Sequence, residues 1–135
     1  MNLHKWLLIP LCAALLACGS NDTVFLPAQH WKNVEIVVEA RPSPLRVGAN
    51  EFIVRATNKD GRAAYDLVMS IRLNDSRPWQ QAIQDGQTGI YRRGLILAAG
   101  EHVDSLSMRI VRGDEQGFIK FPLQVEESST PGPNS

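Results

Sequence analysis

The sequence predicts an all-β domain, an antiparallel β-sandwich of about seven strands, behind a short export segment. Three observations predict it. Apolar and polar residues alternate in several short runs after residue 33, turn-forming residues separate these runs, and no run keeps the 3.6-residue apolar period of a helix. We therefore expect a domain over residues 33–125, and roughly 95 residues is a suitable length for one sandwich.

Residues 1–17 have the pattern of a secretory signal peptide. Lys5 supplies a positive charge, and the following stretch from 6 to 17 (WLLIPLCAALLA) carries none. This stretch is shorter than the roughly 20 apolar residues that a membrane-spanning helix needs. Its length and its charged start fit the apolar region of a cleaved signal instead.

The end of this stretch resembles a bacterial lipobox. Leu15, Leu16 and Ala17 precede Cys18, and the resemblance implies cleavage before Cys18, with a diacylglycerol on its thiol. Gly19 follows where an Asp would favour retention at the inner membrane, so we expect a lipid-anchored protein of the bacterial cell envelope, facing the periplasm from the outer membrane. Each acyl methylene contributes about 0.8 kcal/mol to anchoring. The alternatives are an ordinary signal peptide and a structural Cys18.

The predicted strands follow a short polar tether over 18–32. Val34, Ile36, Val38 and Ala40 share one face of a first strand, and Arg41-Pro42-Ser43-Pro44 ends it because proline cannot donate to a sheet. After a turn at 47–50, a second strand covers 51–57. Asn58-Lys59-Asp60-Gly61 then predicts a tight turn, since glycine readily adopts a positive φ.

The second half of the domain repeats this pattern. Leu67, Met69, Ile71 and Leu73 alternate in the clearest strand, over 66–73. Further strands are expected at 79–84, 89–97, 102–112 and 117–125. The tail over 126–135 (EESSTPGPNS) has no large apolar residue and is expected to be disordered.

The order of these pieces resembles the YtkA-like group of exported immunoglobulin-like domains, to which the FixH proteins are related. The similar segments are 45–54 (LRVGANEFIV), 58–62 (NKDGR), 89–92 (GIYR) and 117–125 (GFIKFPLQV). The resemblance covers residues 34–125 and implies an immunoglobulin-like antiparallel β-sandwich. It also implies a link to copper handling or terminal-oxidase assembly.

The chain departs from this group where a metal would bind. Members often have a Gly-x-Trp step and a loop rich in Met and His, and here the corresponding residues are Gly100-Glu101-His102 and the segment 74–81 (NDSRPWQQ). Copper(I) prefers thioether and imidazole ligands, for which Met69, His102 and Met108 are the weak candidates. His102 and Met108 would lie about 20 Å apart in one strand, so core packing is the favoured interpretation of the methionines.

A polar and aromatic stretch offers a candidate binding surface. Trp, Tyr and Arg dominate the energetic centres of interfaces, and Arg77, Trp79, Tyr91 and Arg92 lie around one expected hairpin. For Trp79 and Tyr91 the alternative, packing in the core or at its rim, is the favoured interpretation. The predicted partner is an envelope protein or glycan.

Composition and motifs exclude several other functions. The 14 basic residues balance 14 acidic ones, so there is no basic surplus for nucleic acid. Ser70, Ser105 and Ser107 have no nucleophile elbow around them, and His102 and Asp104 cannot orient a triad unaided. No phosphate loop or zinc spacing occurs. We therefore expect a non-catalytic binding or accessory module without a cofactor; the alternative is a periplasmic copper-handling or terminal-oxidase assembly factor.

Overall fold

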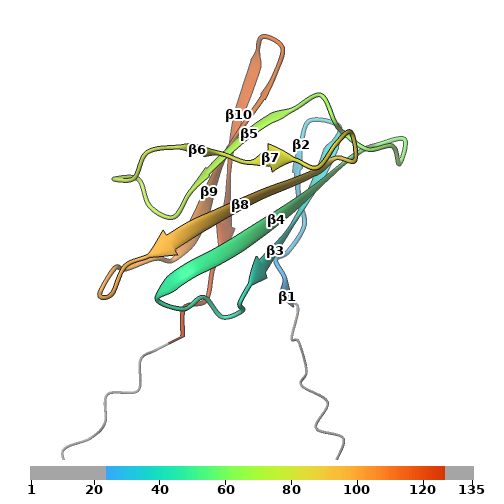
Figure 1. The fold of residues 1–135 in the computed structure, drawn as a ribbon. Helices are drawn as coiled ribbons and strands as arrows, with labels where there is room; N and C mark the ends of the chain where they lie inside the picture. Colours follow the sequence, from blue (N-terminus) through green and yellow to red (C-terminus); the bar gives the residue numbers. More distant parts are fainter. Residues whose placement is uncertain (1–23, 127–135) are drawn as a thin grey trace, which may run out of the picture.

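Two antiparallel β-sheets pack face to face in the structure, a computed structural model that describes residues 24–126 (Figure 1). Each sheet buries one face against the other. The strands are β1 (Val24–Phe25), β2 (Gln29–Trp31), β3 (Val34–Arg41), β4 (Gly48–Asn58), β5 (Val68–Arg72), β6 (Gln80–Gln81), β7 (Ile83–Gln84), β8 (Ile90–Leu97), β9 (Ser105–Arg112) and β10 (Glu115–Pro122).

The strand order confirms the immunoglobulin-like sandwich. One sheet runs β1-β3-β4-β8-β7, with β2 also paired to β3, and the other runs β10-β9-β5-β6. Thus β3, β4, β8 and β7 correspond to strands A, B, E and D of an immunoglobulin domain, and β10, β9 and β5 to strands G, F and C. The described residues form ten strands instead of about seven, because 79–84 divides into β6 and β7 and two strands precede β3.

Alternating side chains fill the space between the sheets, as the sequence pattern predicts. The residues that point inward are fully or almost fully buried: Val34, Ile36, Val38, Phe52, Val54, Leu67, Met69, Ile71, Leu106, Met108, Ile110 and Phe121. Burial of each large aliphatic side chain contributes about 1.5–3 kcal/mol. One continuous core therefore holds the two sheets together.

The segment 24–32 belongs to the sandwich, although its sequence predicts a tether that ends at residue 32. β1 and β2 both pair with β3, and the Gln29 side chain donates to the Lys120 carbonyl of β10 at 2.5 Å. Trp31 is 9% exposed. Its indole lies against Gly117, where an added Cβ would be only 2.0 Å from the indole nitrogen. Strands of two and three residues are too short to show an alternating pattern.

The loop between β3 and β4 lies at the end of the sandwich where the described chain begins and ends (Figure 1). The Asn50 amide accepts from the Arg46 N–H at 3.0 Å and donates to the Arg46 carbonyl at 2.7 Å. Leu45 exchanges backbone hydrogen bonds with Gln124 and Glu126. The turn predicted at 47–50 is wrong, because Gly48 already pairs with Leu97 and begins β4.

The predicted signal peptide over 1–17, the predicted lipidation site Cys18 and the predicted tail beyond Glu126 lie outside the described residues. Within 24–126, no helix has the length and apolar character needed to cross a membrane.

Candidate functional site

An aromatic and cationic cluster covers the outer face of the four-stranded sheet. Trp79, in the connection from β5 to β6, lies with its ring centroid 4.1 Å from the guanidinium carbon of Arg72 and 5.3 Å from that of Arg109. The Phe118 ring of β10 lies 6.0 Å away at an angle of 43°. We call these four residues the Trp79 surface. Both arginines lie within the distance at which a guanidinium is attracted by an indole ring.

The pleat of the sheet explains why these side chains meet. Arg109 pairs with Ser70 of β5 on one side and with Phe118 of β10 on the other, so the three side chains share one face. Arg72 lies two residues beyond Ser70 and shares that face. Ser70 and Ser107 of the same face are 4% and 5% exposed, since the larger side chains beside them cover them. Phe118 remains 63% exposed.

Among residues 24–126, the Trp79 surface has more positive than negative charge. The Arg72 guanidinium pairs with Asp75 at 2.9 Å, and the Lys120 ammonium lies 3.8 Å from the same carboxylate. Among residues 24–126, by contrast, no carboxylate forms an ion pair with Arg109. The Arg109 guanidinium, beside two aromatic rings, can bind a carboxylate of a partner, because a guanidinium presents several donors in a fixed plane.

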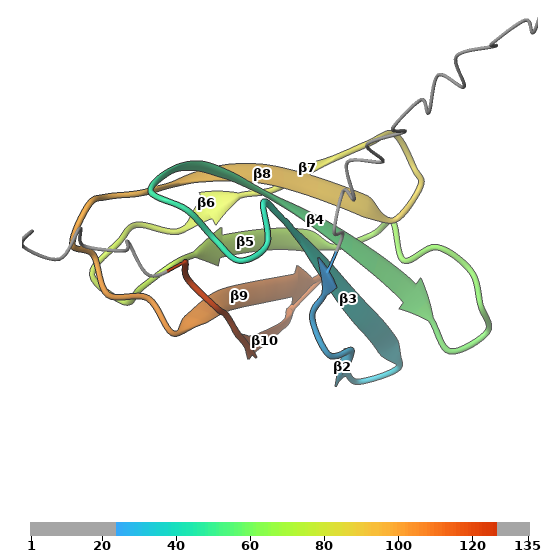
Figure 2. The same cartoon turned by 90° about the horizontal axis from the view of Figure 1, so that it is seen from below.

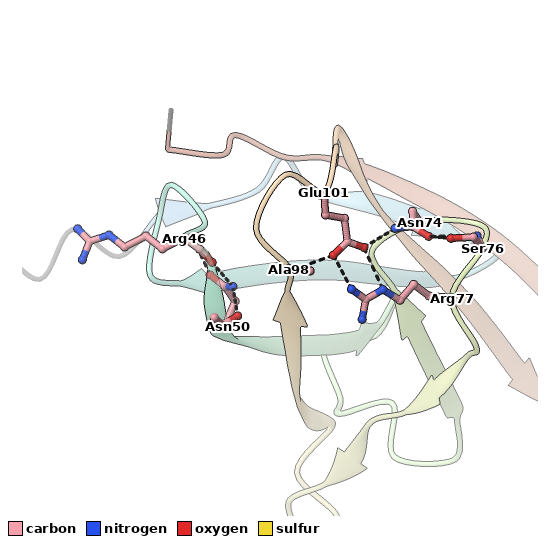
Figure 3. A network of polar contacts seen from close by, with 8 residues as sticks. Arg46, Asn50, Asn74, Ser76, Arg77, Ala98 and Glu101 are labelled. Carbon is pink, nitrogen blue, oxygen red and sulfur yellow. Dashed lines mark hydrogen bonds and ion pairs between the residues drawn. The ribbon is translucent and has the colours of Figure 1, made fainter. Parts of the chain in front are cut away.

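Arg77, a predicted binding residue, forms hydrogen bonds and an ion pair within the domain. Its Nε and Nη2 atoms donate to the Glu101 carboxylate at 2.9 and 2.5 Å (Figure 3). Asn74 Nδ2 and the Ala98 N–H donate to the same carboxylate at 2.5 and 2.9 Å. The Ala98 N–H, and then Arg77 and Asn74, lower the pKa of Glu101. This network joins the connection after β5 to the loop between β8 and β9.

Tyr91 is a core residue, which corrects its assignment to a partner surface. It points between the sheets from β8 and is 1% exposed. Its hydroxyl donates to the Ala64 carbonyl at 2.8 Å and accepts from the Leu67 N–H at 3.4 Å. Burial raises the pKa of the Tyr91 hydroxyl. The side chain therefore secures the crossover from β4 to β5, and the alternative of core packing holds.

Arg92 is separated from Trp79 by the thickness of the sandwich. It follows Tyr91 in β8 and so points to the outer face of the other sheet, where its Nη1 lies 3.5 Å from the Glu51 carboxylate. The structure therefore leaves only Trp79, of the four predicted residues, in the aromatic and cationic cluster. Arg77 borders it through its backbone carbonyl, which accepts from Arg72 at 3.4 Å.

The weak copper candidates do not form a site. Met69 and Met108 are fully buried in the core, whereas His102 is exposed in the loop before β9. The strand predicted over 102–112 begins only at Ser105, so His102 and Met108 do not share a strand. Within the described part of the chain, no three His, Cys, Asp or Glu side chains gather as metal ligands.

A hollow of about 420 Å³ lies at the end of the sandwich opposite the β3–β4 loop. Arg112 lines a second hollow that shares Asn58 and Lys59 with the first, and it donates to Asn58 at 3.0 Å and to Asp66 at 2.8 Å. The basic and acidic groups that line this region balance: Lys32, Lys59 and Arg112 face Glu35, Asp60 and Asp66. The hollow therefore lacks the charge preference found at the Trp79 surface.

Sequence reasoning missed Arg72, Arg109 and Phe118. A signal existed for Phe118, because the inward phase of its strand is set by Gly117, Ile119 and Phe121 and leaves Phe118 facing out. The meeting of the three residues depends on the order β10-β9-β5, which the alternation does not specify.

Comparisons of the chain with protein-family models, curated proteins and solved structures give no match.

Proposed function

We propose that this protein is a lipid-anchored binding module of the bacterial cell envelope, without catalytic activity, that recognises an acidic surface of a partner protein through the Trp79 surface. The observation that carries the proposal is the contact of Trp79 with the exposed Phe118 ring beside Arg109, which has no ion-pair partner among residues 24–126. Aromatic and arginine side chains give interfaces most of their binding energy.

The geometry supports binding in preference to a purely structural role for this cluster. A sheet needs one face for its core, and the core lies on the opposite face from Trp79. The exposed Phe118 ring contributes little to stability, since an aromatic ring stabilises a fold mainly by leaving water. The two rings and the Arg109 guanidinium together suit a protein surface with carboxylates among apolar groups.

The lipobox resemblance at Cys18 supports a membrane location for the module. The protein would then meet its partner among other envelope components, on a surface where diffusion is confined to two dimensions. The resemblance to the YtkA-like group is compatible with such an accessory role. The buried Met69 and Met108 and the exposed His102 give no support to copper binding.

Photo-crosslinking in intact cells tests the recognition surface. A photoreactive amino acid at position 118 should give a defined adduct, and the substitution Arg109→Glu should abolish that adduct by reversing the charge beside the rings. The same photoreactive residue at position 92 is the matched control, because Arg92 is exposed on the opposite sheet.

Equal adducts from positions 118 and 92, or an adduct at 118 that survives Arg109→Glu, would contradict the proposed surface. An adduct with polysaccharide instead of protein would assign the surface to a glycan. Intact-mass measurement of the wild type beside Cys18→Ser tests the anchor: a diacyl or triacyl increment on a chain that begins at Cys18 is expected, and the mutant should lack it.

A further inference from the structure

An exposed apolar patch lies at the end of the sandwich where the described chain begins. Val47 and Ile96 are 62% and 57% exposed, and Ala49 and Ala98 are exposed beside them. Ala49 pairs with Ile96, and the ladder between β4 and β8 ends where Gly48 pairs with Leu97. The inward phase of β8 belongs to Leu95 and Leu97, so Ile96 and its partner Ala49 point to the outer face, and the exposed Val47 and Ala98 lie just beyond the last pair of this ladder. We call these four residues the end patch.

β1 begins at this same end of the sandwich. β3 ends at Arg41 beside the β3–β4 loop, and β1 is antiparallel to β3 with Val24 opposite Ala40. Figure 2 views the sandwich from the end where this loop and the β8–β9 loop lie. The described chain therefore begins, at Val24, at the end of the sandwich that carries the end patch.

The chain between Cys18 and Val24 is too short to let the domain turn over. Only residues 19–23 separate them, and six steps along a fully extended chain span about 20 Å. The eight residues of β3 alone extend about 26 Å along the sandwich. An acyl group on Cys18 thus keeps the end patch close to the bilayer and the β9–β10 turn far from it.

We propose that the end patch lies in the interfacial region of the lipid bilayer when Cys18 is acylated. This proposal depends on the lipid anchor of the proposed function and adds a second, noncovalent contact with the same membrane. The patch carries no charge of its own, so apolar burial at the boundary of the headgroups drives the contact. The strands then run roughly along the membrane normal. The Trp79 surface, on the outer face of the four-stranded sheet, therefore points toward neighbouring proteins in the plane of the membrane.

Site-specific fluorescence on the acylated protein tests this contact. Cys12 lies in the predicted signal peptide and the Cys18 thiol would be acylated, so a cysteine introduced into the domain is the single free thiol. The variant Val47→Cys is labelled with a polarity-sensitive dye and reconstituted in phosphatidylethanolamine–phosphatidylglycerol vesicles that contain lipids brominated near the headgroup. Asp114→Cys, in the β9–β10 turn at the far end, is the matched control.

Quenching at position 47 is expected to exceed that at position 114 by about twofold or more, since interfacial burial reaches only about 5–10 Å into the bilayer. The added substitution Ile96→Asp should reduce quenching at position 47, because it places a charge in the patch. Equal quenching at positions 47 and 114 in protein whose mass includes the acyl increment would overturn the contact and leave the anchor intact. If unlabelled Val47→Cys protein forms a disulfide between two copies, and the labelled protein shows no quenching at position 47, the patch is a self-association surface and the proposed membrane contact is overturned too. A mass without the increment would overturn both proposals.

Discussion

Glu101 is the residue on which the two loops beside the Trp79 surface depend. Its carboxylate receives four hydrogen bonds, from Ala98, Arg77 and Asn74. These bonds favour the charged form and lower the pKa of Glu101 from its ordinary value of 4.5. Glu101 therefore stabilises the fold fully above pH 4.5, and this contribution is lost as the pH falls through the lowered pKa.

We predict that Glu101→Gln lowers the free energy of unfolding at pH 7 by about 1.5–3 kcal/mol, as expected for hydrogen bonds with a charged group. The difference from the wild type should shrink below pH 4.5, and urea unfolding measured from pH 3 to pH 7 checks this. Glu51→Gln, at an exposed ion pair, should cost about 0–1 kcal/mol. A difference for Glu101→Gln that stays constant from pH 3 to pH 7 would contradict the role of its charge.

Single residues of the candidate site were only partly predictable. Residue type alone marked Trp79, Tyr91 and Arg92 as interface residues, yet the parity of β8 sends Tyr91 inward and Arg92 to the opposite sheet. A one-residue step reverses the direction of a side chain in a strand. Composition identifies groups capable of binding, whereas strand phase decides which of them reach the surface.

At the scale of elements, β2 and β10 fit together through a glycine. The Trp31 indole occupies the space where any other residue at position 117 would place its Cβ. We predict that Gly117→Ala lowers the free energy of unfolding by about 1–3 kcal/mol, the usual cost of overpacking a core. Thermal and urea unfolding measure the change.

Gly94→Ala is the matched control for this substitution. Gly94 also lies inside a strand, and a Cβ added there would have the Asn50 carbonyl oxygen as its nearest atom, at 3.9 Å. Alanine at this position should leave stability unchanged or raise it by about 0.4–1 kcal/mol, because it restricts the unfolded chain. Equal losses of unfolding free energy for Gly117→Ala and Gly94→Ala would show that the packing of the Trp31 indole does not require glycine at position 117.

The elements themselves were largely predictable. All seven expected strands have a counterpart. Six of them are strands of five or more residues, and alternation over that length specifies both the strand and its buried face; the seventh, expected at 79–84, is present only as the two-residue strands β6 and β7. The pairing of β1 and β2 with β3 was not predictable, since it depends on edges that the longer strands leave open. The start of β4 was missed because Gly48 and Asn50 are typical turn residues.

For the whole molecule, the boundary at residue 24 has a measurable consequence. We predict that deletion of 24–32 lowers the free energy of unfolding by at least about 3–5 kcal/mol, the usual cost of losing a buried tryptophan. Trp31→Ala in the full chain should account for most of the loss. If the deletion variant is as stable as the wild type in urea, segment 24–32 is not part of the folded domain, and the tether ends at residue 32 as the sequence predicts.

The contacts between β2 and β10 also join the two ends of the described chain, with Gln29 and Lys120 separated by 91 positions. A contact between residues so far apart in the chain costs conformational entropy, because a long loop must close before the contact can stabilise the fold. Pairings of this kind form slowly. When the chain emerges N-terminus first, Trp31 has no binding place until Gly117 arrives. The contacts of β2 therefore form only after β10 has been synthesised, and until then the apolar Trp31 side chain stays accessible to chaperones and proteases.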